Sequence, residues 1–359
     1  MNERKLKILY ITQAIDKDFY LLAPFYKWLN LFSSRMEKIY ALCLQEGRHE
    51  DLADNIEVKS LGKETGNRKL QYIFNFYKYT LSLILWEKVD LIFVHMNELY
   101  VFMLWPFAVL AGIPIVIWRA HGRLDWKAKL VTKLASAIVT SSETGHQVVS
   151  AKRQIIGQCV DLDHFPLKRD YPEKPEKIIW VGRISQVKNL ETLISAAEIL
   201  TNQGLSLHFD IIGSAPDQAG LNYLAGLKEL INQKGLADNF VFAGEIDHED
   251  LPSIYKSADI FINTSNTGSL DKTVLEAMAT GLFVINSNYG FDKILENFPE
   301  CKFKQGDQKE LADKIKFAVS LDKDTRSVLG GKLREIVASD HTLNSFIEKL
   351  YQVLLKQIK

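Results

Sequence analysis

The sequence predicts an α/β protein built from two doubly wound, Rossmann-like domains, and three observations support this prediction. Short apolar runs alternate with longer segments of helical pattern along the whole chain of 359 residues. The runs are apolar throughout rather than at every second residue, which is typical of parallel strands buried on both faces of a sheet. A charged, proline-rich segment at 160–176 interrupts the alternation once, after which it starts again.

In the first half, the candidate strands are short and rich in Ile, Leu and Val, so they favour the extended conformation. Amphipathic or apolar stretches of helical length, such as 24–35 and 71–86, separate several of them. This order predicts a parallel sheet covered by helices. The strands are expected at residues 7–12, 39–44, 56–61, 91–95, 113–118, 137–140 and 154–156.

The segment 99–118 has no charged residue and is long enough to span a bilayer. The alternative is a helix followed by a buried strand. Pro106, Gly112 and Pro114 interrupt the segment, and the β-branched residues at 115–117 suit a strand. We therefore predict a helix and then a strand rather than a transmembrane helix.

The second half repeats the same pattern. Residues 190–200 read as a helix, and residues 341–359 as another, with Phe346, Leu350, Val353 and Leu354 at helical spacing. The last helix either packs on the second domain or returns to the first. We expect domains at 1–165 and 166–340, followed by the C-terminal helix at 341–359. The strands are expected at residues 177–181, 207–212, 240–243, 260–263 and 282–286.

Composition narrows the class of protein. The chain has 44 basic and 44 acidic residues, so no overall field favours nucleic acid as a partner. The three cysteines, Cys43, Cys159 and Cys301, form no Cys-x-x-Cys pair, which argues against a disulfide scaffold or zinc cluster and fits a reducing cytoplasm. The apolar stretch at 8–12 is too short for a signal peptide. We expect a cytoplasmic enzyme.

The first chemical motif runs from Val181 to Leu193; it lies at the end of the first strand of the second half and opens a helix. Gly182 permits close approach of backbone to a ligand. Arg183 and Lys188 bracket this loop at the carboxyl edge of the sheet, where doubly wound folds bind ligands. Two fixed cations at this edge suit a diphosphate, both while it is bound and while it departs as a leaving group that gains negative charge. The alternative is a pair of solvated surface cations.

The second motif is a small, polar loop at 266–271 that leads into a short helix ended by Gly281. The free N–H groups at a helix start, near Leu270 to Lys272, suit phosphate oxygens. Glu276 lies among apolar neighbours in this helix, so its carboxylate needs a partner. Ribose hydroxyls are one candidate partner, and a structural Lys or Arg is the other.

Together, these two stretches resemble the retaining GT-B glycosyltransferases of the family-4 group. The resemblance covers 165–290 well, including residues 242–244 and 259–262, and is weaker in the first half. It implies two domains facing across a cleft, with Arg183 and Lys188 on the diphosphate of a nucleotide sugar and Glu276 on its ribose. The donor site implied in this way comprises Gly182, Arg183, Lys188, Gly244, Ser269, Leu270, Asp271 and Glu276.

Two loops depart from the family pattern. Gly268 stands where many members have a first Glu that contacts the donor sugar, and Asp271 is the nearest substitute carboxylate. The first loop, 12–18, lacks the paired glycines that often lie near the phosphates. The donor sugar and its orientation therefore stay open.

In the first half, His121 follows a strand and precedes a glycine, and it resembles the family's His at this point. A His in this place can donate to a sugar hydroxyl at the reacting centre, whereas a loop hydrogen bond is the structural alternative. Asn97, Glu98 and Arg119 are candidates for the acceptor side of the cleft. His95 reads equally well as a cleft residue or as a core residue.

The resemblance implies retaining transfer of a glycosyl group from a nucleotide sugar, such as a UDP-sugar, to a glycan or lipid-linked acceptor, as in cell-envelope polysaccharide biosynthesis. We expect no cofactor. We also expect no metal, because the Asp-x-Asp pairs at 16–18 and 161–163 do not follow strands. The alternatives are a catalytically inactive sugar-nucleotide-binding homologue and a nucleotide-sugar epimerase. Aromatic stretches at 19–32 and 72–86 suit either peripheral membrane contact or internal helices.

Overall fold

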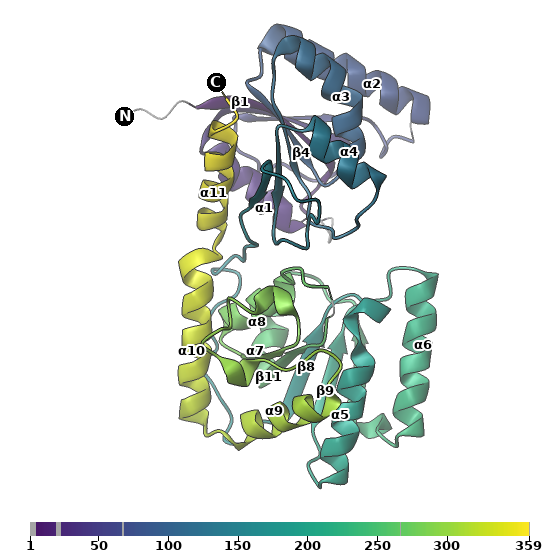
Figure 1. The fold of residues 1–359 in the computed structure, drawn as a ribbon, viewed down its shortest axis with the longest axis vertical. Coiled ribbons are helices and arrows are strands. Elements are labelled where there is room, and N and C mark those ends of the chain that lie inside the picture. The colour runs from purple at the N-terminus through teal and green to yellow at the C-terminus, as the bar shows by residue number, and fades with distance from the viewer. Residues whose placement is uncertain (1–4, 19–22, 67, 266, 359) are drawn as a thin grey trace. The chain divides into compact units, whose positions relative to one another are not determined.

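The computed structural model describes residues 5–18, 23–66, 68–265 and 267–358. The chain forms two compact units, each with its own parallel sheet (Figure 1). Unit 1 comprises residues 1–157 and 343–359, and unit 2 comprises residues 158–342. The fold class is therefore the predicted one, with two Rossmann-like α/β units.

Unit 1 holds a seven-stranded sheet in the order β3-β2-β1-β4-β5-β6-β7, with every neighbouring pair parallel. Strand order reverses beside β1, whose neighbours are β2 and β4, and such a reversal opens a crevice at the carboxyl ends of the strands. The strands are β1 (Leu6–Ile15), β2 (Met36–Glu46), β3 (Ile56–Ser60), β4 (Leu91–His95), β5 (Ile115–Trp118), β6 (Ala137–Thr140) and β7 (Arg153–Ile155).

Helices cover both faces of this sheet. The helices α2, α3 and α4 connect successive strands in one direction across the sheet, while α1 runs in the other direction and packs beside α11 (Figure 1). They are α1 (Ala23–Ser33), α2 (Lys69–Ser82) with the π-helical turn η1 (Leu83–Glu87), α3 (Glu98–Ala111), α4 (Trp126–Leu134) and α11 (Leu343–Leu355).

The uncharged segment at 99–118 is a helix and then a strand, as predicted. Helix α3 ends at Ala111, and Gly112 caps it with a φ of 68° before β5 begins at Ile115. Among the described residues, no helix has the length and apolar character needed to cross a membrane.

Unit 2 holds a five-stranded parallel sheet in the order β10-β9-β8-β11-β12. Here the order reverses beside β8, whose neighbours are β9 and β11. Buried side chains such as Trp180, Phe209 and Phe261 join the sheet to its helices in one core. The strands are β8 (Lys177–Val181), β9 (His208–Ile212), β10 (Phe240–Gly244), β11 (Ile260–Asn263) and β12 (Phe283–Asn286).

The helices of unit 2 follow the same alternating order. The α-helices are α5 (Leu190–Asn202), α6 (Gln218–Gln233), α7 (Leu251–Ser257), α8 (Lys272–Thr280), α9 (Gln308–Ser320) and α10 (Lys323–Asp340). Short 3-10 turns lie at η2 (Gln186–Lys188), η3 (Ala237–Asn239), η4 (Tyr289–Phe291) and η5 (Pro299–Cys301).

The boundary between the units differs from the expected residue 166. Residues from 158 onward belong to unit 2 because Val160 N–H donates to His341 O at 2.8 Å, and the His341 ring bonds to Gln158 O at 2.9 Å. Helix α11 belongs to unit 1, where Phe346 stacks on Trp28 with ring centroids 4.4 Å apart.

Candidate functional site

Three glycines meet at the carboxyl ends of β8, β9 and β10 in unit 2. Gly182 N–H donates to Ile212 O at 2.9 Å, and Gly213 N–H donates to Gly244 O at 2.7 Å. Gly213 has a φ of +133°, and a Cβ built on it would lie 1.8 Å from Gly182 O. Only glycine fits there, because the backbone of Gly182 packs against it, and the three glycines leave this edge of the sheet without side chains. Gly182 and Gly244 were recognisable from the sequence, whereas the role of Gly213 follows only from the pairing of the strands.

Arg183 and Lys188 follow this edge but differ in their surroundings. Arg183 is exposed, and the described residues give it no hydrogen bond or ion pair. Lys188 is largely buried, and its Nζ lies 2.7 Å from Asp271 Oδ1 and 3.4 Å from Ser265 Oγ. Thr264 Oγ1 also donates to Lys188 O at 2.6 Å. The loop after β8 is thereby fastened to the loop after β11, and Lys188 is not a solvated surface cation.

Asp271 has a different role from the substitute sugar ligand that we considered. Its Oδ1 accepts from Lys188, while its Oδ2 accepts from Asn263 Nδ2 at 3.0 Å and Asn288 Nδ2 at 3.1 Å. Both oxygens are engaged within the protein, so this carboxylate holds Lys188 in place. No sequence pattern pointed to Asn263, which ends β11, or to Asn288, which follows β12.

The loop at 267–271 explains why residue 268 is glycine. Gly268 has a φ of +67°, and a Cβ there would lie 2.1 Å from the ring of Tyr289. A side chain at residue 268 would therefore have to displace the ring of Tyr289 and adopt a left-handed backbone conformation. Hydroxyls of Ser265, Thr267 and Ser269 form a chain with O–O distances of 3.1 and 2.8 Å.

The start of α8 has the free N–H groups that the sequence suggested. Asp271 occupies the cap position, but its side chain makes no capping hydrogen bond to the first turn. Leu270, just before, is half-buried against the core of unit 2. Uncapped N–H groups at a helix start are suited to anionic oxygens.

Glu276 is 2% exposed and has three polar neighbours. Tyr255 OH donates to Oε2 at 3.0 Å, while His248 Nε2 and Lys272 Nζ lie 3.8 and 3.9 Å from Oε1. Burial opposes ionisation, but His248, Lys272 and Tyr255 together hold the pKa of this carboxyl below its ordinary value. The structural cation that we considered is therefore present as Lys272. No periodic pattern in the sequence pointed to His248 or Tyr255.

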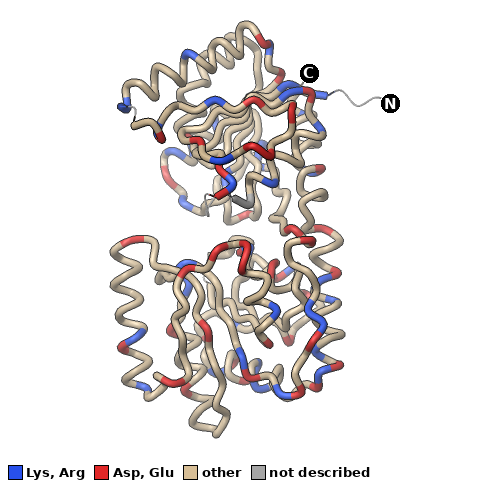
Figure 2. The backbone as a smooth tube through the Cα atoms, turned by 180° about the vertical axis from the view of Figure 1, so that it is seen from behind, with Lys and Arg blue, Asp and Glu red and all other residues tan. Residues whose placement is uncertain are grey.

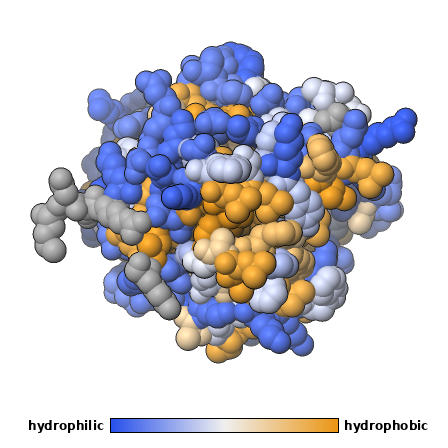
Figure 3. All heavy atoms as spheres, turned by 90° about the horizontal axis from the view of Figure 1, so that it is seen from above, coloured by the Kyte–Doolittle hydropathy of each residue, from blue (hydrophilic) through white to orange (hydrophobic). Residues whose placement is uncertain are grey.

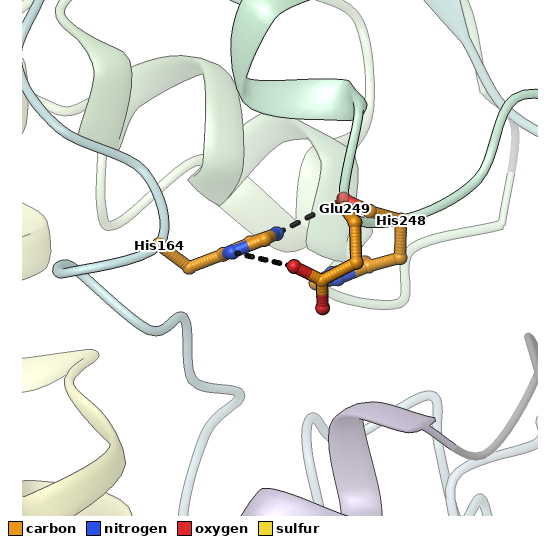
Figure 4. A group of neighbouring side chains, drawn as sticks. All are labelled: His164, His248 and Glu249. Carbon is orange, nitrogen blue, oxygen red and sulfur yellow. Dashed lines mark hydrogen bonds and ion pairs between the residues drawn. The ribbon is translucent and has the colours of Figure 1, made fainter. Parts of the chain in front are cut away.

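His164, His248 and Glu249 form a cluster beside this carboxylate (Figure 4). The two imidazole rings stack with centroids 4.6 Å apart and planes 5° from parallel. His164 Nε2 bonds to His248 O at 2.9 Å, and its Nδ1 lies 3.8 Å from Glu249 Oε2. Metal ligands direct their lone pairs at one point, which stacked, parallel rings do not. We therefore assign no metal to this cluster.

In unit 1, Arg119 organises the loop that carries His121. Its guanidinium is fully buried and donates to Glu98 Oε1 at 2.9 Å, His121 O at 2.8 Å and Arg123 O at 2.7 Å. This corrects the expectation that Arg119 lies on the acceptor side of a cleft. A fully buried guanidinium bonded in this way positions the loop rather than meeting a ligand.

Glu98 and His121 form a second pair in this loop. Glu98 Oε1 lies 3.2 Å from His121 Nε2, and the His121 side chain is 40% exposed. Burial raises the pKa of Glu98, but the bonds to His121 and Arg119 outweigh it and lower the pKa to about 2. Asn97 caps α3, its side chain accepting from Leu99 N–H at 3.1 Å. The His121 side chain is thus more exposed than those of Glu98, at 11%, and Arg119, at 0%.

His95 is a core residue. It is 1% exposed, its Nδ1 lies 3.2 Å from Thr12 Oγ1, and the rings of Tyr10, Phe25 and Trp28 surround it. Burial lowers its pKa to about 3, so the ring is neutral at physiological pH. The structure supports the interpretation of His95 as a core residue rather than as a cleft residue.

Two Rossmann-like α/β units in one chain are the architecture of the GT-B fold class. Residues 164–334, a little under half of the chain, match the family model described as glycosyl transferases group 1. Over its whole length, the chain is similar in structure to HepE of Anabaena, solved in complex with UDP, with a TM-score of 0.75 and 16% identity over 98% of this chain and 100% of that one. At this identity, the likeness establishes the fold.

Curated relatives align over shorter stretches. The sulfoquinovosyl transferase SQD2 of Arabidopsis thaliana is 32% identical over 174 residues, which are 47% of this chain and 31% of the relative. The putative colanic acid biosynthesis glycosyltransferase WcaL of Escherichia coli (strain K12) is 27% identical over 207 residues, 54% of this chain and 50% of the relative. The chain thus spans about a third to a half of the length of these relatives. These findings show that part of the chain is similar in sequence to glycosyltransferases.

Proposed function

We propose that this protein is a retaining, nucleotide-sugar-dependent glycosyltransferase of the family-4 type. One observation carries the proposal: Lys188 is fixed by Asp271 at the carboxyl edge of the unit 2 sheet, in the same strand-to-helix region as Arg183. Two cations, the bare glycine edge and an uncapped helix start together suit a diphosphate. Glu276 lies five residues beyond Asp271, in the helix that begins there.

In the proposed reaction, the bond between the sugar C1 and the diphosphate oxygen breaks while a bond from the acceptor hydroxyl oxygen to C1 forms on the same face. The diphosphate leaves with the electron pair, and Arg183 and Lys188 stabilise its growing charge. One of its oxygens takes the acceptor's proton. Glu276 accepts hydrogen bonds from the ribose, and His121 donates to a sugar hydroxyl. The reaction requires neither a cofactor nor a metal ion.

The choice of substrates rests on the comparisons. HepE, seen with UDP, supports a UDP-sugar as donor, and WcaL, described as a colanic acid biosynthesis enzyme, supports a glycan or lipid-linked acceptor in envelope polysaccharide synthesis. Residue 268 is a glycine, and the ring of Tyr289 lies where its side chain would begin. In the proposed complex, the donor sugar therefore lacks the carboxylate contact of the family pattern. We place the reaction in the cytoplasm.

The test incubates purified protein with a panel of UDP-sugars and a cell-envelope acceptor pool, and it measures UDP release and the anomeric configuration of the product by NMR. We expect acceptor-dependent transfer with retention, unchanged by EDTA and lost in Lys188→Ala. His121→Ala should lower turnover without weakening UDP binding. UDP binding with no transfer would identify a binding homologue, and conversion of the donor without acceptor would identify an epimerase.

A further inference from the structure

The Glu276 carboxylate is hydrogen-bonded through one of its two oxygens. Tyr255 OH donates to Oε2 at 3.0 Å, whereas His248 Nε2 and Lys272 Nζ lie 3.8 and 3.9 Å from Oε1. Because N–H···O hydrogen bonds span about 2.7–3.2 Å, these two groups attract Oε1 electrostatically without occupying its lone pairs. Among the described residues, Oε1 therefore keeps its capacity to accept hydrogen bonds from a ligand.

A buried carboxylate with an unbonded oxygen points to a ligand more strongly than surface features do. In Figure 2, basic and acidic residues are interspersed along the described backbone of unit 2, so nucleotide binding there needs a local explanation. The face of the molecule in Figure 3 shows apolar side chains among hydrophilic ones, and single exposed apolar residues are ordinary on a folded chain. Glu276 is 2% exposed, and buried polar groups normally find partners.

His248 places an unbonded ring nitrogen near Oε1 of this carboxylate. Its Nε2 is buried and makes no hydrogen bond within the part of the chain that the structure describes. The residue lies in the loop between β10 and α7, in a turn closed by the bond from Asp250 N–H to Asp247 O at 3.0 Å. Burial of an unbonded nitrogen is unfavourable, and the nearby carboxylate offsets part of this cost.

The ring of His248 is held in a packed aromatic cluster. His164 stacks on it with centroids 4.6 Å apart, and His164 Nε2 donates to His248 O at 2.9 Å (Figure 4). The ring of Phe165 meets the rings of both His248 and Tyr255 edge to face, at centroid distances of 5.6 and 5.7 Å. The groups that face the two oxygens of Glu276 are therefore fixed by shared neighbours.

We propose that His248 is a positioning residue, which orients the Glu276 carboxylate so that Oε1 meets the two ribose hydroxyls of a ribonucleoside diphosphate. The inference rests on the proposed function, which assigns Glu276 to the ribose but gives His248 no role. Both ribose hydroxyls are donors, and a carboxylate oxygen with free lone pairs accepts from them. A 2′-deoxyribose lacks one of these donors, so the site selects ribonucleotides over 2′-deoxyribonucleotides.

A purely structural role for His248 predicts a different result. If the ring only filled space, its replacement would lower stability and would change the affinity for ribonucleotides and 2′-deoxyribonucleotides alike. A positioning role acts through the contact between Glu276 and the 2′-hydroxyl. It therefore changes the ratio of the two affinities, which is the quantity to measure.

The test measures calorimetric binding of UDP and 2′-deoxy-UDP to the full chain. We expect the wild type to bind UDP at least about tenfold more tightly than 2′-deoxy-UDP, and Glu276→Gln to bind the two with similar affinity. His248→Leu keeps the approximate size of the side chain but removes the ring nitrogens, and it should lower the ratio at least about threefold. His248→Gln restores an N–H donor near the position of Nε2 and should recover most of the ratio.

The matched control is His208→Leu, which removes an exposed histidine whose Nε2 lies 3.2 Å from Asp210 Oδ1 and should leave both affinities unchanged. Thermal unfolding checks that each variant is folded. The inference is overturned, while the proposed function stands, if His248→Leu keeps the wild-type ratio or if His248→Gln recovers none of it. Wild-type protein that binds neither nucleotide overturns both.

Discussion

Lys188 and Asp271 form an ion pair at 2.7 Å between the loop after β8 and the start of α8. Both side chains are largely buried, at 14% and 13% exposed. The same carboxylate accepts from two asparagine side chains, so the position of the ammonium group is fixed before any ligand arrives. A preorganised cation is what an enzyme needs where negative charge develops.

Asp271→Asn should lower the free energy of unfolding by about 1–3 kcal/mol, because it leaves a largely buried ammonium group without its charged partner. Urea unfolding of both proteins measures this loss. The matched control is Glu173→Gln, which breaks the exposed pair with Lys323 and should cost little. Equal losses in the two variants would show that the Asp271 pair is no stronger than a surface pair.

Gly268→Ala should destabilise unit 2 more than Gly306→Ala does. Both glycines have positive φ angles, 67° and 76°, which cost a non-glycine residue about 1–2 kcal/mol. At Gly306 no atom lies near an added Cβ, whereas at Gly268 the ring of Tyr289 does. The variants Gly268→Ala and Gly306→Ala are compared by their thermal unfolding midpoints. The double variant Gly268→Ala/Tyr289→Ala should recover part of the difference, and no recovery would contradict the steric explanation.

Tyr255→Phe should cost about 1.5–3 kcal/mol of stability, because it removes the hydroxyl that donates to the buried Glu276 carboxylate. It should also weaken UDP binding, measured by calorimetry, since Glu276 loses one of the contacts that orient it. Tyr77→Phe in unit 1 is the control and should leave UDP binding unchanged. Unaltered binding in Tyr255→Phe would separate Glu276 from the donor site.

The stability of unit 1 should fall in acid because of Glu98. Its pKa is about 2 in the folded chain and ordinarily 4.5, so its ionised form is favoured by folding. The contribution is complete above pH 4.5 and is lost as the pH falls towards 2. The difference in free energy of unfolding between the wild type and Glu98→Gln should therefore shrink by about 1–3 kcal/mol between pH 6 and pH 3. A pH-independent difference would contradict the assignment.

The sequence predicted the fold well because apolar runs mark parallel strands directly. β4, β6, β8 and β11 begin and end at the predicted residues, while β1 and β2 extend beyond them because their ends pair with each other past the apolar runs. The predicted domain boundary at residue 166 differs from the observed one at residue 158. The hydrogen bond from Val160 to His341 joins segments that are distant in the sequence.

The sequence predicted residues of the candidate site only where they belong to a motif. Arg183, Lys188 and Glu276 stand in loops of recognisable spacing, but nothing local indicated that Asp271 bonds to Lys188 or that His248 approaches Glu276. The burial of Arg119 was not predictable, because its partners are Glu98 and loop carbonyls that only the folded chain brings together. Contacts between loops of different strands depend on sheet order, which residue patterns do not specify.

The most direct measurement is calorimetric titration of UDP into the wild type, Arg183→Ala, Lys188→Ala and the control Lys332→Ala, which changes an exposed lysine of α10. We predict saturable binding to the wild type and the control, with affinity at least about tenfold lower in each of the other two variants, the equivalent of about 1.4 kcal/mol. Wild-type protein that binds no nucleoside diphosphate, or Arg183→Ala and Lys188→Ala variants that bind UDP as tightly as the wild type, would contradict it.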